Sequence, residues 1–211
     1  MIEIKKIVFN DFQVNTYFIF DETGEALVVD PACYGDDDEQ RFLNFVEENN
    51  LNPVKIVNTH PHIDHIVGNE FVKTIFSAKL VGHPAGVEFF NNATTMALAL
   101  GFNMEKADKP DIYVEEGDTI DFGNSKLDVI YTPGHADGSI SLIVKEKKAV
   151  VVGDLLFAGS IGRTDLPTGN QELLLESVRK KIFTLDKEYK VLSGHGPETT
   201  VGLEMETNPY F

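Results

Sequence analysis

The chain contains no tryptophan, only one cysteine and no long apolar run. With a single cysteine, Cys33, it can form neither an internal disulfide nor a cysteine-based zinc cluster, and we interpret this residue as a small apolar side chain in a loop. A membrane-spanning helix needs roughly 18 consecutive apolar residues, so we expect no membrane partner. The N-terminus, Met-Ile-Glu-Ile-Lys-Lys, lacks the basic start and apolar centre of a signal peptide, which predicts a cytoplasmic protein.

Basic residues are also scarce, with 18 Lys and Arg against 34 Asp and Glu and a net charge of −16. Such a surface repels a phosphate backbone, which argues against a nucleic-acid partner. A length of 211 residues with 42% hydrophobic content, including 15 Phe, suits one layered α/β domain over residues 1–211.

Metal-ligand residue types are concentrated in one short segment. Three of the six histidines and one aspartate lie within Thr-His-Pro-His-Ile-Asp-His, as His60, His62, Asp64 and His65. Positions two apart on an extended segment point the same way, so His60 and His62 can bind one ion together. Asp64 and His65 would open a helical run over 66–76 and face a second ion. Imidazole and carboxylate donors suit zinc, iron and manganese.

Three more candidate ligands each follow an apolar strand through a glycine, as Gly134-His135, Gly153-Asp154 and Gly194-His195. Ligands gather beyond strand ends in layered α/β proteins, so we expect these side chains to converge with the first group. The set of five histidines and two aspartates is sufficient for two ions that share one carboxylate.

Periodicity and turn residues predict the main elements around these motifs. We expect strands at 14–20, 26–30, 54–59 and 79–81, then mainly strands over 115–152, and helices at 41–48, 66–76, 85–100 and 171–184. The segment Thr94–Leu100 is interpreted as packing, with a lid over the site as the alternative.

In order and kind, His-x-His-x-Asp-His, Pro-Gly-His, Gly-Asp and Gly-His-Gly-Pro resemble the metallo-β-lactamase superfamily. The stretch Leu156–Pro167 and the ending Gly-His-Gly-Pro-Glu-Thr-Thr resemble its short glyoxalase II-like (hydroxyacylglutathione hydrolase-like) members. The resemblance implies a four-layer αββα sandwich.

By position, the resemblance implies that His60, His62 and His135 hold the first metal. Asp64, His65 and His195 would hold the second, and Asp154 would bridge the two. Asp30 would support the site through hydrogen bonds, whereas His83 matches no ligand position and is interpreted as a helix cap or supporting residue.

The implied function is hydrolysis of a small-molecule thioester by a metal-bound hydroxide, with two divalent ions, zinc favoured and iron or manganese as alternatives. Asp64 would orient the water and accept its proton, and Arg163 would pair either with a substrate carboxylate or with Asp165. The chain ends at Phe211 without the C-terminal helical domain of true glyoxalase II enzymes, which predicts weak discrimination for glutathione.

Three alternatives remain. The runner-up is a persulfide dioxygenase with a single non-heme iron, because those enzymes share Gly-Arg-Thr-Asp. A β-lactamase fits less well, since those enzymes are generally exported. The third alternative is a non-catalytic metal-binding or redox partner module.

Overall fold

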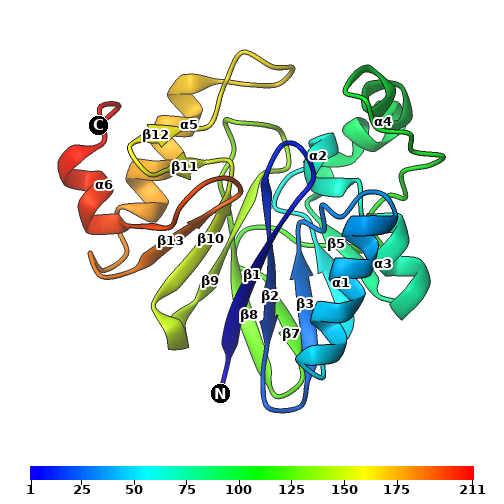
Figure 1. The fold of residues 1–211 in the computed structure, drawn as a ribbon. Helices are drawn as coiled ribbons and strands as arrows, with labels where there is room; N and C mark the ends of the chain where they lie inside the picture. The colour runs from blue at the N-terminus through cyan, green and yellow to red at the C-terminus, as the bar shows by residue number, and fades with distance from the viewer.

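The computed structural model describes residues 1–211 and has two six-stranded sheets packed face to face, with helices covering both outer faces (Figure 1). This arrangement is the four-layer αββα sandwich that the resemblance implies. None of its helices combines the length and apolar character that crossing a membrane requires.

The first sheet is built entirely from residues 3–113, the N-terminal part of the chain. Its strands, in spatial order, are β1 (Glu3–Phe9), β2 (Val14–Phe20), β3 (Glu25–Val29), β4 (Asn52–Val57), β5 (Lys79–Gly82) and β6 (Ile112–Tyr113). Strands β1 to β3 form an antiparallel meander, and β3 to β6 are parallel. Parallel strands need crossover connections, and helices supply them here.

The second sheet comes entirely from the second half. Its strands, in spatial order, are β14 (Thr199–Thr200), β13 (Lys190–Ser193), β10 (Ala149–Gly153), β9 (Ile140–Val144), β8 (Ser125–Tyr131) and β7 (Thr119–Phe122). Only β10 and β13 pair in parallel. A small hairpin of β11 (Leu156–Phe157) and β12 (Ser160–Ile161) stands apart from it.

The helices divide between the two outer faces in the same way. Beside the first sheet lie α1 (Asp36–Glu48), α2 (Ile63–Ile66), α3 (Asn69–Phe76) and α4 (Val87–Ala99); beside the second lie α5 (Gln171–Ser177), the π turn Val178–Ile182 that extends it, and α6 (Val201–Thr207) (Figure 1). Short 3₁₀ turns occur at Pro84–Gly86 and Lys145–Lys147.

Alternation along the strands explains the three apolar layers. On β2, Phe18 and Phe20 pack outward against the helices, whereas Tyr17 and Ile19 pack inward between the sheets. Successive strand residues point to opposite faces, so a strand covered on both sides is buried along its whole length, as β2 is. A third apolar cluster, which includes Leu174, lies between the second sheet and α5.

Most of the expected elements are present, with two informative differences. Helix α1 begins at Asp36 rather than at Arg41, because four acidic residues in its first turn suit the positive end of the helix dipole. The expected helix over 66–76 is broken into α2 and α3 around Gly68. A Cβ there would lie 2.7 Å from the Pro31 carbonyl oxygen and 2.9 Å from Cys33 Sγ, so the chain passes too close for a side chain. Cys33 itself is buried, and burial raises the pKa of its thiol.

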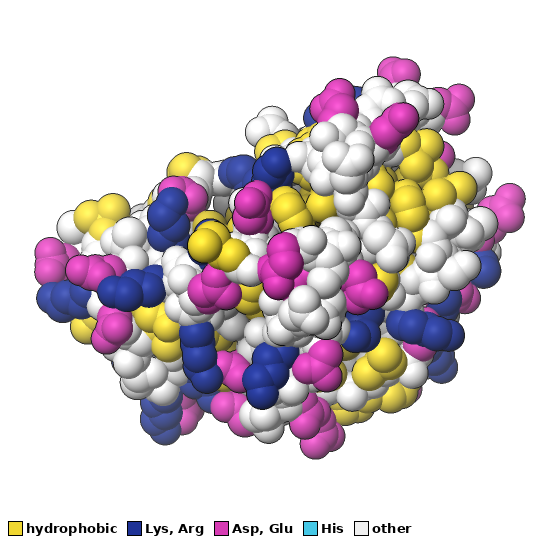
Figure 2. All heavy atoms as spheres, turned by 90° about the horizontal axis from the view of Figure 1, so that it is seen from below, with side chains coloured by type: hydrophobic (Ala, Val, Ile, Leu, Met, Phe, Trp, Pro, Cys, Tyr) yellow, Lys and Arg dark blue, Asp and Glu magenta, His cyan; other side chains and the backbone are white.

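At the lower end of the sandwich, Asp21 links the two sheets. It accepts hydrogen bonds from Thr23 N and Thr23 Oγ1 in its own hairpin, and from Asn124 N (2.7 Å) and Ser125 Oγ (2.8 Å) in the β7–β8 turn. Burial alone would raise its pKa, but these bonds outweigh burial and lower the pKa to about 2. Figure 2 views this end, where acidic, basic and apolar side chains are interspersed and no histidine is visible.

Asp21→Ala is expected to lower the free energy of unfolding at neutral pH by about 1–2 kcal/mol, because it removes the acceptor of the hydrogen bonds that link the two sheets. A carboxyl with a lowered folded-state pKa stabilises above its unfolded value of about 3.9, and that stability is lost as pH falls toward 2. Urea unfolding of both proteins should therefore show a difference that shrinks between about pH 4 and pH 2. Asp121→Ala, at an exposed carboxylate on β7, is the control; an equal effect of the two changes would contradict the proposed link.

Candidate metal centre

The first group of candidate ligands comes together where β4 and β8 end. His60 and His62 follow β4, and His135 follows β8. His135 Nε2 lies 2.9 Å from His62 Nδ1, and the His60 ring centroid lies 4.8 Å from those of His62 and His135. One ligand atom from each residue falls within 4.8 Å of the others, so the three can surround one ion.

The second group lies beside the first. Asp64 and His65 occupy the short helix α2, and His195 follows β13. His65 Nε2 lies 3.2 Å from His195 Nε2, and Asp64 Oδ2 lies 3.5 Å and 3.4 Å from these two nitrogens. These three residues also form a set of ligand atoms within 4.8 Å.

Asp154 lies between the two groups. Its Oδ1 is 3.5 Å from His65 Nε2, while its Oδ2 is 3.7 Å from His135 Nε2 and 3.5 Å from His195 Nε2. Gly194 makes this approach possible, because a Cβ there would lie 2.2 Å from Asp154 Oδ1. The carboxylate can therefore face both groups.

Hydrogen bonds fix the orientation of four imidazole rings. The Nδ1–H of His135 donates to the Arg163 carbonyl (2.7 Å), and that of His195 donates to the Phe12 carbonyl (2.8 Å). The Nδ1–H of His65 donates to Asp30 Oδ2 (3.0 Å). His60 Nδ1–H can donate to Thr59 Oγ1 (3.0 Å), whose hydroxyl donates to Asp30. Each of these rings thus turns Nε2 toward the cluster. A hydrogen bond from the other ring nitrogen commonly fixes the orientation and tautomer of a metal-binding histidine in this way.

Asp30 belongs to this supporting layer, although it also lies within ligand distance of His60 and His65. Both of its oxygens are engaged: Oδ1 accepts from Thr59 N (2.7 Å), and Oδ2 accepts from Thr59 Oγ1 and His65. His83 has a different position. Its Nδ1 caps the turn at Pro84 by accepting from Ala85 N, and its ring stacks on Tyr131, as the cap interpretation predicts.

The charges of the two groups differ. Burial and neighbouring imidazoles lower the pKa of His60 and bring that of His62 to about 4, so these rings are neutral donors at physiological pH. Burial would also lower the pKa of His65 and His195, but Asp154 and Asp64 outweigh it and raise the values to about 9 and about 10. A cation in the second group therefore displaces protons, as metal binding commonly does.

Two buried polar atoms test whether a cation fits. His60 Nε2 and Asp154 Oδ1 are buried without any hydrogen-bond partner. Such atoms are rare in folded proteins because an unsatisfied buried polar group is costly. Both face the cluster of nitrogen and oxygen donors, so the residues present fit bound divalent ions.

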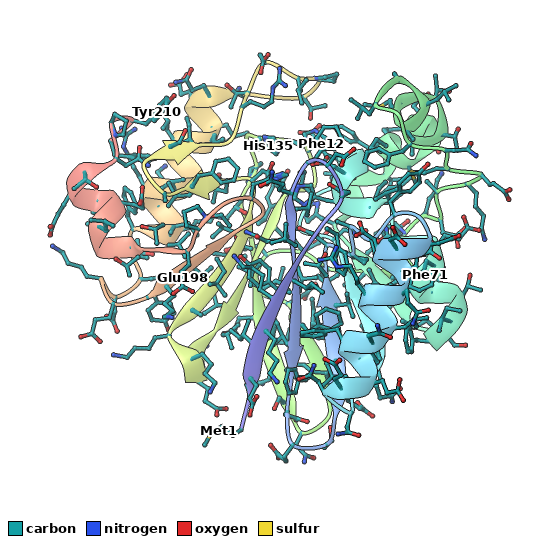
Figure 3. All side chains as sticks on the ribbon, viewed as in Figure 1. Met1, Phe12, Phe71, His135, Glu198 and Tyr210 are labelled. Atoms are coloured by element: carbon teal, nitrogen blue, oxygen red, sulfur yellow. The ribbon has the colours of Figure 1, made fainter.

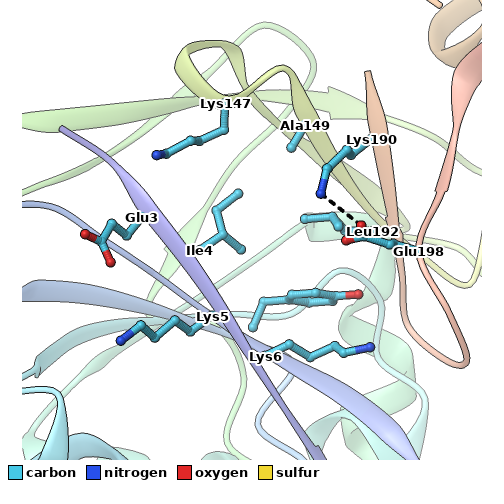
Figure 4. A pocket seen from close by; sticks show the side chains of 10 residues that line it. Glu3, Ile4, Lys5, Lys6, Lys147, Ala149, Lys190, Leu192 and Glu198 are labelled. Carbon is cyan, nitrogen blue, oxygen red and sulfur yellow. Dashed lines mark hydrogen bonds and ion pairs between the residues drawn. The ribbon is translucent and has the colours of Figure 1, made fainter. Parts of the chain in front are cut away.

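A pocket of about 400 Å³ opens directly onto the cluster. Its walls are mainly apolar, formed by Phe12, Ile63, Met96, Leu100, Leu166 and Pro167. Figure 3 labels Phe12 and His135 close together at the upper end of the sheets. A second hollow of about 410 Å³, between β1 and β13, is lined by lysines such as Lys147 and Lys190 and contains no histidine or aspartate (Figure 4).

Residues 9–195 match the sequence model of the metallo-beta-lactamase superfamily. The chain belongs to this superfamily. It is therefore a member of a superfamily of metallo-hydrolases. Its His and Asp cluster lies where strands of both sheets end. The two sheets with their outer helices also match the fold of solved superfamily structures.

Relatives in the superfamily are similar over almost their full length. The chain is 37% identical to the probable metallo-hydrolase YqgX of Bacillus subtilis, covering 94% of this chain and 92% of the relative. It is 33% identical to the hydroxyacylglutathione hydrolase GloC of Haemophilus influenzae, covering 94% and 93%.

Solved structures show the same agreement. The BLEG-1 B3 metallo-beta-lactamase superposes with a TM-score of 0.88 at 32% identity, covering 99% of both chains. TTHA1623 in a di-iron-bound form gives 0.88 at 31% identity, covering 98% of this chain and 100% of that one. ETHE1 from Myxococcus xanthus gives 0.80 at 28% identity, covering 98% and 83%.

All seven sequence-derived ligand candidates lie in the cluster, and Arg163 lines the pocket. The Arg163 side chain donates two hydrogen bonds to Asp165, from Nε (2.8 Å) and Nη2 (2.7 Å). Sequence reasoning missed the pocket walls. Of the segment Thr94–Leu100, Ala97 packs in the core, but Met96 and Leu100 face the pocket.

Proposed function

We propose that the protein hydrolyses thioesters with two divalent metal ions, zinc in preference to iron or manganese. His60, His62 and His135 would hold the first ion, Asp64, His65 and His195 would hold the second, and Asp154 would be shared between them. The observation that carries this proposal is the pair of three-donor sets, both facing Asp154, at the floor of one pocket. The similarity to a hydroxyacylglutathione hydrolase supports the thioester substrate.

When bound, the ions supply a water of lowered pKa and a Lewis acid for the substrate carbonyl. Asp64 lies in the pocket, and nearby imidazoles overcome the effect of burial to keep its pKa low. Its carboxylate orients the attacking water and accepts its proton. Asp30 holds His65 in place, and the Phe12 carbonyl does the same for His195.

The leaving group explains why a thioester suits this site. The lining has no acid or base besides the metal-ligand candidates and Arg163. A thiol has a pKa near 8.5, so a thiolate departs without a strong general acid. Amide or alkoxide leaving groups depend more strongly on protonation, for which the pocket offers only the proton that Asp64 has accepted from the water.

The decisive assay follows the chemistry directly. Metal-loaded protein should release free thiol from S-D-lactoylglutathione or a simple acyl thioester, and chelation should abolish the reaction. Oxygen uptake on glutathione persulfide without thioester cleavage would instead favour a single-iron dioxygenase, a candidate kept because the first donor set is complete by itself. A chromogenic β-lactam is included because BLEG-1 is similar. Metal binding without turnover on any substrate would favour a non-catalytic module.

Discrimination among thiol carriers is expected to be weak. Apart from the metal-ligand candidates, the one basic residue in the pocket lining is Arg163, and its charge is already balanced by Asp165, which weakens its attraction for the carboxylates of glutathione. For one acyl group carried on glutathione, coenzyme A or a small synthetic thiol, kcat/KM should agree within about tenfold. A thousandfold preference for glutathione would contradict this expectation.

A further inference from the structure

Apart from the metal-ligand candidates, the pocket presents almost no charge. Arg163 is its single additional ionisable lining residue, and its Nε and Nη2 donate to Asp165, whose carboxylate balances its charge. The remaining lining is apolar and comes from four separate parts of the chain: Phe12 from the β1–β2 turn, Ile63 from α2, Met96 and Leu100 from the end of α4, and Leu166 from the segment after β12.

The apolar lining continues to the mouth of the pocket. Phe12 is 42% exposed and Leu100 is 45% exposed, and both line the pocket. The Phe12 ring packs on Phe102, which in turn packs on Tyr34, so the wall is held by neighbouring aromatic rings. These exposed side chains and the other apolar lining residues form the apolar wall of the pocket that contains the cluster.

We propose that this pocket selects thioesters with an apolar, uncharged acyl chain, which lies along the wall formed by Phe12, Met96, Leu100 and Leu166. The proposal rests on the thioester activity proposed above and adds the acyl class to it. Burial of each methylene is worth a factor of about four when it is complete. A carboxylate on the acyl chain would lose hydration against an apolar wall without gaining a free cation.

The test compares acetyl, butanoyl, hexanoyl and hemisuccinyl thioesters of one small neutral thiol, N-acetylcysteamine, on metal-loaded protein. From acetyl to hexanoyl, kcat/KM should rise by about 20-fold or more, a part of the full gain because the wall is half-exposed. The hemisuccinyl thioester should react at least about tenfold more slowly than the butanoyl thioester. A flat series, or a preference for hemisuccinyl, would overturn the proposal.

Binding of uncleavable thioether analogues separates this inference from the proposed activity. Calorimetry should show the dissociation constant tightening with chain length whether or not the enzyme cleaves thioesters. Binding that tightens with chain length but without turnover would contradict the thioester activity and support the apolar acyl site. Turnover without any effect of chain length on binding would support the thioester activity and contradict the apolar acyl site.

Two leucines at the C-terminal end of α4 provide matched variants: Leu98 within the helix, and Leu100 directly after it. Leu100→Glu places a charge in the wall and should flatten the hexanoyl-to-acetyl ratio to within about threefold. Leu98→Glu changes an exposed leucine two residues earlier that does not line the pocket, and the ratio should stay at its wild-type value. Equal effects of the two variants would contradict the assignment of the wall.

Asp165→Asn tests the charge argument in the opposite direction. It leaves Arg163 without its carboxylate partner, so the guanidinium becomes available to an anionic acyl chain. The hemisuccinyl-to-butanoyl ratio should then rise by about threefold or more. An unchanged ratio would show that Arg163 does not face the acyl chain.

Discussion

Replacing Asp64 with asparagine is expected to lower kcat for thioester cleavage by about 100-fold or more, because the amide cannot accept a proton from the attacking water. Asparagine keeps the size and one oxygen of the side chain, so the pocket should retain its shape. If Asp64 acts only after substrate is bound, kcat and kcat/KM should fall together.

Metal content must be measured on the same preparation, since Asp64 also lies within ligand distance of His65 and His195. A large loss of kcat with both ions retained assigns the proton transfer to Asp64. Loss of an ion would show instead that Asp64 acts mainly as a ligand. Asp137→Asn, at a carboxylate that does not line the pocket, is the control and should keep kcat within about twofold of wild type. A variant Asp64→Asn with undiminished kcat would remove Asp64 from the mechanism.

His195→Ala is expected to reduce bound metal from close to two ions per chain to close to one. The change removes one of three donors from the second group, whereas His60, His62 and His135 stay intact. Elemental analysis of wild type and variant, both saturated and then desalted, measures the difference directly. Thiol release by the variant should fall by about 100-fold or more, since the second ion shares in activating the water.

His83→Ala is the matched control, because His83 is a histidine near the site that caps a turn and is not part of the cluster. It should keep both ions. A saturated wild-type protein that holds only one ion, or a His195→Ala variant that keeps two, would overturn the binuclear assignment.

The ligand cluster could be predicted because its signal is local. Each candidate follows an apolar strand within a few residues, and residue type with spacing is enough to place it at a strand end. The same local signal found the hairpin after β2 and the main helices. Strand β1 carried no such signal, since Glu3–Phe9 is a half-exposed edge strand with charged residues among its apolar ones.

The pocket walls could not be predicted in this way. Phe12 and Leu100 are far apart in sequence and line one pocket only because α4 packs near the β1–β2 turn. The break at Gly68 has a similar origin, since the atoms that forbid a side chain there belong to Pro31 and Cys33. Both features depend on tertiary contacts between segments, and sequence periodicity does not contain them.

The link between Val114 and Asp118 divides the chain into two parts, each with its own sheet. Neither part carries a complete donor set. The first part contributes two ligands to each proposed ion, and the second contributes His135 to one, His195 to the other and Asp154 to both. Bound metal would thus act as a cross-link between the two halves, opposite the Asp21 contacts at the far end. Mutations that weaken the packing between the two sheets would then first lower the affinity for metal, well before the chain unfolds.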